Sequence, residues 1–163
     1  MSDQLKVRVL FVCMGNICRS PTAEGVFRKM LADAGVDMVV ETDSAGTHGY
    51  HVGRPADARA QEAARKRGVD ISDLRARQVE LSDYDYFDYL LAMDRANEEI
   101  LLADAPRAQR DKVRMFLEFA PDAAQDEVPD PYYGGDKGFE RVLDLVEEAA
   151  RGFLDHLRRT HAV

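Results

Sequence analysis

Short runs rich in apolar and β-branched residues alternate with longer amphipathic segments along the chain. The runs predict buried strands at 6–13, 38–42, 86–93 and 113–116. The longer segments, in which apolar residues recur every three or four positions, predict helices at 20–34, 57–67, 95–103 and 138–159. Ser20 is expected to cap the first helix, Pro21 to occupy its first position, and Gly35 to end it.

The alternation of strands and helices predicts an α/β fold. We expect one domain over residues 1–163, with a doubly wound, four-stranded parallel sheet and helices on both faces. Residues 44–47 are expected to form a turn, and the Pro-, Asp- and Gly-rich segment 121–138 a long loop. In such sheets ligands bind beyond the carboxyl ends of the strands, so the loop at 14–19 is well placed to bind one.

Composition narrows the functional classes. Of the 163 residues, 45% are hydrophobic and 32% charged, a balance typical of a globular chain. The net charge of −8 disfavours nucleic acid and anionic membranes as partners. Two cysteines close together provide no disulfide framework, and with the four histidines they form no zinc ligand set, so neither a metal nor a cofactor is expected. Without a recognisable secretory signal, a cytoplasmic location is expected.

The loop after the first strand carries the strongest chemical signal. Cys13 and Arg19 are separated by five residues in a segment that leaves a strand and opens a helix, where free N–H groups bind phosphate. We expect Gly15 to let these groups point inward, Arg19 to grip two phosphoryl oxygens, and Ser20 to donate to the Cys13 sulfur. The same donors favour a thiolate, and therefore nucleophilic attack on phosphorus. The other loop residues are Met14, Asn16, Ile17 and Cys18.

The segment Val-Leu-Phe-Val-Cys-Met-Gly-Asn-Ile-Cys-Arg-Ser-Pro-Thr-Ala-Glu resembles the low-molecular-weight protein-tyrosine phosphatases. The resemblance covers nearly the whole chain and includes four other short motifs, at 43–47, 52–55, 76–78 and 93–94. It also includes Asp-Pro-Tyr-Tyr-Gly at 130–134. It implies hydrolysis of protein phosphotyrosine through a phosphocysteine intermediate, with a tyrosine-phosphorylated protein such as a tyrosine kinase as substrate and inorganic phosphate as product.

The resemblance also implies roles for residues on the 121–138 loop. Asp130 matches the general acid that protonates the leaving phenolate and then activates water, although an Asp-Pro pair alone usually marks a turn. Tyr132 and Tyr133 match the wall of the substrate cleft, with ordinary loop anchoring as the alternative. Tyr50 is expected on the opposite wall, flanked by His48 and His51 as exposed loop residues.

Other matching positions imply support for the loop. Asn16 and Ser44 are expected to hydrogen-bond to each other. Asp94 follows the carboxyl end of the third strand and is expected either to orient Arg19 or the loop, or to cap the next helix. Some family members have a histidine shortly before Ala-Arg-Gln, but 73–75 contain none, so the support must be built differently. Cys18 is either a small apolar filler or, as the family suggests, the partner of Cys13 in a reversible disulfide.

The sequence is also compatible with two other functions. A thiol-dependent arsenate reductase shares the fold and loop, but its reaction needs further cysteines and the chain has none after Cys18. A phosphate- or phosphotyrosine-binding module would need the loop and Arg19 but neither the thiol nor Asp130. The chain is expected to be a monomer or to self-associate weakly.

Overall fold

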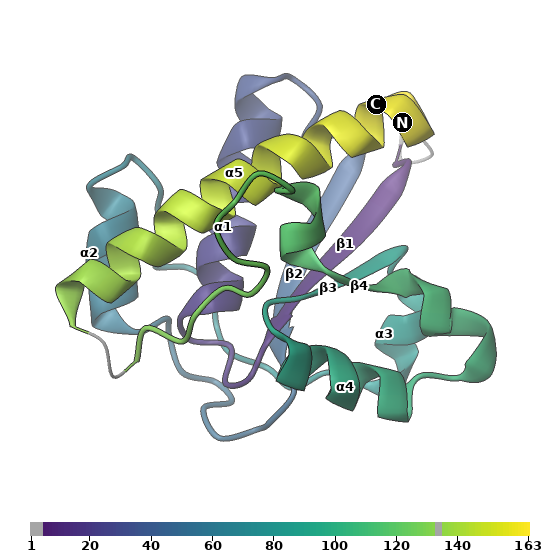
Figure 1. Cartoon of the computed structure of the whole chain (residues 1–163), viewed down its shortest axis with the longest axis horizontal. Helices are drawn as coiled ribbons and strands as arrows, with labels where there is room; N and C mark the ends of the chain where they lie inside the picture. The colour runs from purple at the N-terminus through teal and green to yellow at the C-terminus, as the bar shows by residue number, and fades with distance from the viewer. Residues whose placement is uncertain (1–4, 133–134) are drawn as a thin grey trace.

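Four strands form one parallel sheet in the computed structural model, which describes residues 5–132 and 135–163 (Figure 1). The strands are β1 (Val7–Cys13), β2 (Val40–Gly46), β3 (Tyr89–Ala92) and β4 (Val113–Met115), and their order across the sheet is β2-β1-β3-β4. The chain runs from β1 outward to β2 and then crosses back to β3. The direction therefore reverses beside β1, which is where parallel sheets open a crevice for ligands.

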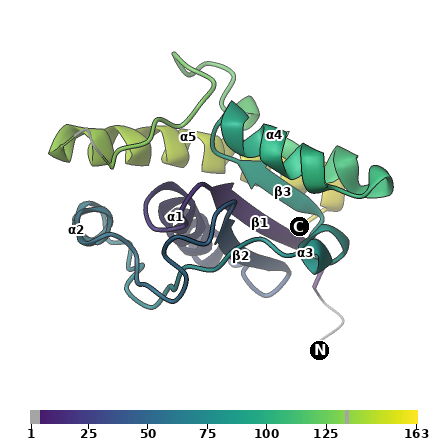
Figure 2. The ribbon, with the colours of Figure 1, turned by 90° about the horizontal axis from the view of Figure 1, so that it is seen from below.

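Helices cover both faces of the sheet, as predicted (Figure 2). They are α1 (Arg19–Asp33), α2 (Ala58–Arg65), α3 (Leu81–Tyr86), α4 (Arg95–Asp104) and α5 (Asp136–His161), with short 3₁₀ helices at Arg107–Lys112 and Phe116–Phe119. Successive side chains of a strand point to opposite faces. Val9 and Phe11 accordingly join the core formed with α1, α2 and α5, whereas Leu10 and Val12 join the core formed with α3 and α4.

Two of the predicted elements were wrong in part. The strand expected at 86–93 begins only at Tyr89, because residues Leu81–Tyr86 form α3. The missed signal was Glu80 followed by Asp83, which form a reciprocal capping box at the start of this helix. The turn expected at 44–47 was also wrong, since β2 continues to Gly46 and pairs with the full length of β1.

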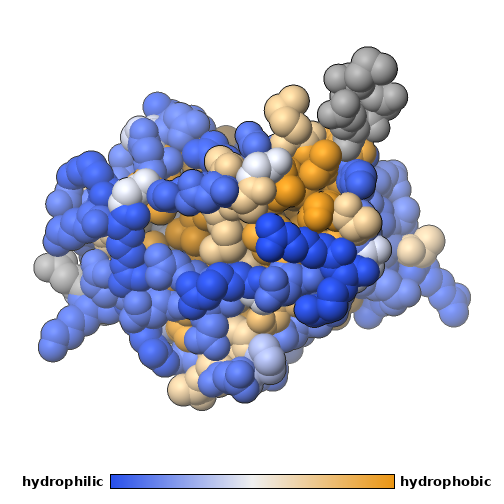
Figure 3. All heavy atoms as spheres, turned by 90° about the horizontal axis from the view of Figure 1, so that it is seen from above, coloured by the Kyte–Doolittle hydropathy of each residue, from blue (hydrophilic) through white to orange (hydrophobic). Residues whose placement is uncertain are grey.

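Helix ends and surface follow the sequence more closely. Gly35 (φ 74°) and Gly68 (φ 79°) adopt the left-handed conformation just after α1 and α2, as expected for residues that end helices. The face seen in Figure 3 is mainly hydrophilic, with apolar side chains gathered in a smaller area. In the described part of the chain, no helix combines the length and apolarity needed to cross a bilayer.

Candidate active site

Cys13 ends the central strand β1 and lies on the floor of the loop that leads into α1. Its side chain is buried, and its Sγ accepts a hydrogen bond from the backbone N–H of Asn16 at 3.3 Å. The Sγ also lies 3.0 Å from the Ser20 hydroxyl. The expectation that Ser20 caps the helix was wrong, because α1 begins at Arg19 and the hydroxyl is turned toward the sulfur instead. Ser20 therefore contacts the Cys13 thiol through its hydroxyl group, as was also expected.

Asn16 holds the loop in its curled shape. Its φ of 59° lies in the left-handed region, which costs a non-glycine residue free energy and requires support from its surroundings. Its Nδ2 donates to the hydroxyls of Ser20 at 2.8 Å and Ser44 at 3.0 Å, and its Oδ1 accepts from the backbone N–H of Arg77 at 2.9 Å. The predicted bond between Asn16 and Ser44 is confirmed, and Arg77 supplies support that the sequence did not indicate.

Gly15 does not supply the unusual backbone conformation that was expected of it. The unusual backbone conformation of the loop falls on Asn16, whereas Gly15 is absent from the positive-φ residues of the described chain. A Cβ atom at Gly15 would approach the His51 ring carbon Cδ2 to 2.9 Å. A side chain at this position would therefore require the His51 ring to shift.

Arg19 is buried beneath the loop with its guanidinium held in place. Its Nη1 donates to Asp94 Oδ2 at 2.6 Å and to the Val128 carbonyl at 3.1 Å. Asp94 also caps α4, because its Oδ1 accepts from the backbone N–H of Asn97 at 2.8 Å, so both expectations for Asp94 are met. Burial alone would lower the pKa of Arg19, but Cys13 and Asp94 outweigh it and raise that pKa above its ordinary value.

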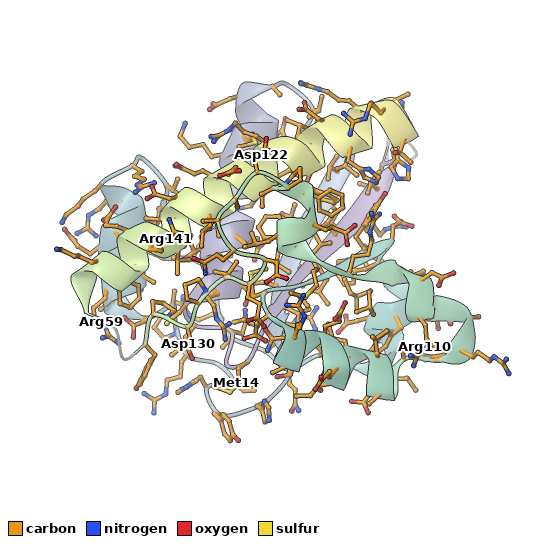
Figure 4. The ribbon with its side chains drawn as sticks, viewed as in Figure 1. Met14, Arg59, Arg110, Asp122, Asp130 and Arg141 are labelled. Atoms are coloured by element: carbon orange, nitrogen blue, oxygen red, sulfur yellow. The ribbon has the colours of Figure 1, made fainter. Side chains whose placement is uncertain are left out.

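Asp130 lies on the loop before α5, and its side chain is close to Arg19. Its Oδ2 lies 3.9 Å from Arg19 Nη2, and its Oδ1 accepts from the backbone N–H of Tyr132 at 3.0 Å. The side chain is 36% exposed, so it remains open to a ligand in the cavity. Figure 4 shows Met14 and Asp130 at the same edge of the molecule, with Asp122 of the same loop lying well away beside α5.

One cavity of about 320 Å³ joins these groups. Cys13, Arg19 and Asp130 all line it, together with Met14, Gly15, Ile17, Cys18, Tyr50, His51 and Tyr132. Tyr50 is 70% exposed and Tyr132 40% exposed, so two aromatic rings stand at its mouth. His51, expected to be an exposed loop residue, is half-buried and forms part of the wall. Tyr133, the other predicted cleft residue, lies outside the described residues.

Cys18 lines the cavity beside Cys13, and both thiols are free. Burial, reinforced by Asp57 and by Cys13, raises the pKa of the Cys18 thiol to about 12. Cys18 therefore stays protonated at neutral pH.

Glu24 belongs to the support of the loop and was not identified from the sequence. It lies on α1 one turn after Ser20, is 4% exposed, and accepts a hydrogen bond from the Ser44 hydroxyl at 2.8 Å. Burial raises its pKa to about 7, against the effect of the Ser44 hydrogen bond. The available signal was a glutamate four residues after Ser20, on the helix face that the periodicity buries.

These contacts define a class of site. A thiol at the carboxyl end of a parallel strand, hydrogen-bonded by a loop N–H and accompanied by a buried guanidinium, provides a nucleophile and an anion site in one cavity. A carboxyl group at the rim provides an acid or a base. Together they define a cysteine-dependent phosphoryl-transfer site.

Comparison with known proteins identifies the family. Residues 8–163 match the family model of the low molecular weight phosphotyrosine protein phosphatases. A low molecular weight protein-tyrosine-phosphatase of Streptomyces coelicolor is 45% identical, covering 93% of both chains, and the Homo sapiens phosphatase is 39% identical, covering 95% of this chain and 98% of its own.

A solved structure gives the same result. The crystal structure of a protein tyrosine phosphatase from Entamoeba histolytica, with Hepes in the active site, superposes with a TM-score of 0.91. It is 40% identical and covers 94% of this chain and 97% of its own. The chain belongs to the low molecular weight phosphotyrosine protein phosphatase family.

Proposed function

We propose that this protein hydrolyses phosphotyrosine in proteins through a phosphocysteine at Cys13. The Cys13 thiolate attacks phosphorus, forming an S–P bond while the P–O bond to tyrosine breaks and Asp130 gives its proton to the departing phenolate. Asp130 then takes a proton from water, whose oxygen attacks the same phosphorus. The S–P bond breaks, and inorganic phosphate leaves with the thiolate restored.

The observation that carries the proposal is the convergence of Cys13, Arg19 and Asp130 on one cavity. Because Asp94 and the Val128 carbonyl hold Nη1 of Arg19, Nη2 remains directed toward Asp130 and the cavity. The guanidinium is therefore positioned before a substrate arrives, which limits the reorganisation needed in the transition state.

The shape of the cavity favours tyrosine over serine. The Cys13 thiol lies on the floor with 2% of the residue exposed, while Tyr50 and Tyr132 stand at the mouth. An aryl phosphate places its phosphorus several ångströms beyond the peptide backbone and offers a flat ring to the aromatic walls. A phosphoserine side chain is shorter and has no ring to stack against Tyr50 or Tyr132.

The test compares hydrolysis of a phosphotyrosine peptide and a phosphoserine peptide at mildly acidic pH. We expect wild-type protein to cleave the phosphotyrosine peptide, Cys13→Ser to be inactive, and Asp130→Ala to be slowed by about 10²–10⁴-fold, as for loss of a general acid. Asp122→Ala is the matched control, because it removes an exposed aspartate from the same loop outside the cavity. An Asp130→Ala variant as fast as Asp122→Ala would overturn the assignment of the acid.

The same assay separates the alternatives. A protein that binds phosphate without turnover would be a binding module, and one that reduces arsenate with an added thiol would be a reductase. The reductase reaction needs thiols beyond Cys13 and Cys18, and the chain has no other cysteine. A binding module has no use for a carboxyl group beside Arg19.

The remaining assignments extend this proposal. We infer one catalytic domain over 1–163, with a tyrosine-phosphorylated protein such as a tyrosine kinase as partner. The protein is a monomer or associates weakly with itself. Two free thiols suit the reducing cytoplasm.

Peroxide would convert Cys13 to a sulfenic acid, and condensation with the Cys18 thiol would release water and form a reversible disulfide. Intact-mass measurement of wild type and Cys18→Ser after peroxide treatment tests this step.

A further inference from the structure

Glu24 is a buried carboxyl group that the proposed chemistry does not use. It faces the interior from α1, and its one hydrogen-bond donor among the described residues is the Ser44 hydroxyl. No ion pair in the described part of the chain includes its carboxylate. A buried carboxylate without a cation is costly, which is why such groups usually neutralise.

The charged groups around Glu24 come from three elements. Arg28 lies on α1 itself, Asp43 on β2, and Asp73 on the turn after α2. Arg28 is paired with Asp73 at 3.3 Å, and Asp43 is paired with Arg77 at 3.1 Å. The neighbouring cations are thus engaged by other carboxylates. Burial raises the pKa of Glu24 to about 7, so both protonation states are populated near neutral pH.

A continuous path of hydrogen bonds joins Glu24 to the nucleophile. Glu24 Oε1 accepts from Ser44 at 2.8 Å, and Ser44 Oγ accepts from Asn16 Nδ2 at 3.0 Å. Asn16 Nδ2 also donates to Ser20 Oγ at 2.8 Å, and this hydroxyl lies 3.0 Å from Cys13 Sγ. A carboxyl oxygen can accept from Ser44 whether or not the other oxygen carries a proton. The path therefore persists in both states, and only the charge at its end changes.

We propose that Glu24 is a positioning residue for the phosphate-binding loop, and that taking up a proton on its carboxylate tightens the binding of an anion in the loop. The loop is built to attract negative charge, and an ionised Glu24 behind it opposes that attraction. By linkage, an anion in the cavity and a proton on Glu24 favour each other. The inference rests on the proposed function only in taking the Cys13 cavity as the anion site.

Inorganic sulfate tests the inference, because it remains a dianion across the pH range and requires no turnover. Its affinity is measured by calorimetry at pH 6 and pH 8 for the Cys13→Ser protein, which lacks the nucleophilic thiol, and for the same protein carrying Glu24→Gln. Glutamine keeps an oxygen for Ser44 but never ionises. His51 and Asp130, which also face the cavity, are present in both proteins, so their titration cancels in the comparison. Glu99→Gln is the surface control.

Between pH 6 and pH 8, the sulfate affinity of the Cys13→Ser protein is expected to fall about fivefold to tenfold more than that of the same protein carrying Glu24→Gln. This difference lies within the usual range of coupling between sites. Equal losses in the two proteins would overturn the inference. If Glu24→Gln does not fold, a second measurement replaces the affinity comparison. It records the proton uptake on binding sulfate at pH 7 for the Cys13→Ser protein and for the same protein carrying Ser44→Ala. Uptake that Ser44→Ala leaves unchanged would also overturn the inference. A sulfate effect without phosphotyrosine hydrolysis would keep this inference and refute the proposed function.

Discussion

Replacing Glu24 by glutamine removes a buried carboxyl group whose ionisation is unfavourable in the folded protein. The pKa of Glu24 rises from its ordinary 4.5 to about 7 on folding, so the folded state holds the proton more tightly than the unfolded state. The favourable contribution of neutral Glu24 is therefore complete below about pH 4.5 and is lost as the pH rises through 7. With about 1.4 kcal/mol for each pH unit, the loss amounts to roughly 3 kcal/mol at pH 8.

The Glu24→Gln variant escapes this loss. Relative to wild type, its free energy of unfolding should gain about 2–3 kcal/mol between pH 5 and pH 8, because ionisation of Glu24 destabilises wild type over this range and the variant has no carboxyl group at this position. The extra N–H groups of glutamine add an offset that is the same at both pH values and cancels from the comparison. For a chain of this length the change corresponds to roughly 5–10 °C in the difference between the two melting temperatures.

Urea unfolding of wild type, Glu24→Gln and Glu99→Gln at pH 5, 6, 7 and 8 measures the effect. Glu99 is exposed on α4, so its replacement controls for the loss of one negative charge from the protein. A difference between Glu24→Gln and wild type that stays constant within about 0.5 kcal/mol across these pH values would refute the reasoning, whatever the sign of the offset.

Two further predictions concern the anion site and its support. Arg19→Lys keeps the charge but loses the planar fork held by Asp94, and we expect kcat/KM for a phosphotyrosine peptide to fall by about 10²–10³-fold; a fall of less than threefold would mean that charge alone suffices. Asn16→Ala removes three hydrogen bonds and retains an unfavourable left-handed backbone, and should lower the free energy of unfolding in urea by about 1–3 kcal/mol. Asn16→Gly should recover part of that loss, and no recovery would argue against backbone strain.

The fold could be predicted from local patterns because its strands and long helices each have a strong periodic signal. α3 could not be predicted, since six residues are too few to show a periodic pattern. The aromatic residues Tyr86 and Phe87 at its end also favour a strand. The end of β2 was missed for another reason. Ser44 and Gly46 are typical turn residues, and what keeps them in the strand is pairing with Phe11 and Cys13, contacts distant in sequence.

Some residues of the site could likewise be predicted from local sequence, and others could not. Cys13, Arg19 and Asp130 were predicted because a short motif and a family resemblance identify them, and the structure places all three on one cavity. Arg77 and Glu24 escaped notice because their importance depends on tertiary contacts with Asn16 and Ser44, which no local spacing encodes.

The left-handed Asn16 has a consequence for engineering. The eight residues from Cys13 to Ser20 do not contain the information that shapes them, because β2 supplies one support through Ser44 and the backbone of Arg77 supplies another. Grafting this octapeptide onto an unrelated strand–helix junction would transplant the reactive groups but not their arrangement. A successful graft must carry the three separate chain segments together, so that the smallest portable unit of this catalyst is a tertiary fragment and not a linear motif.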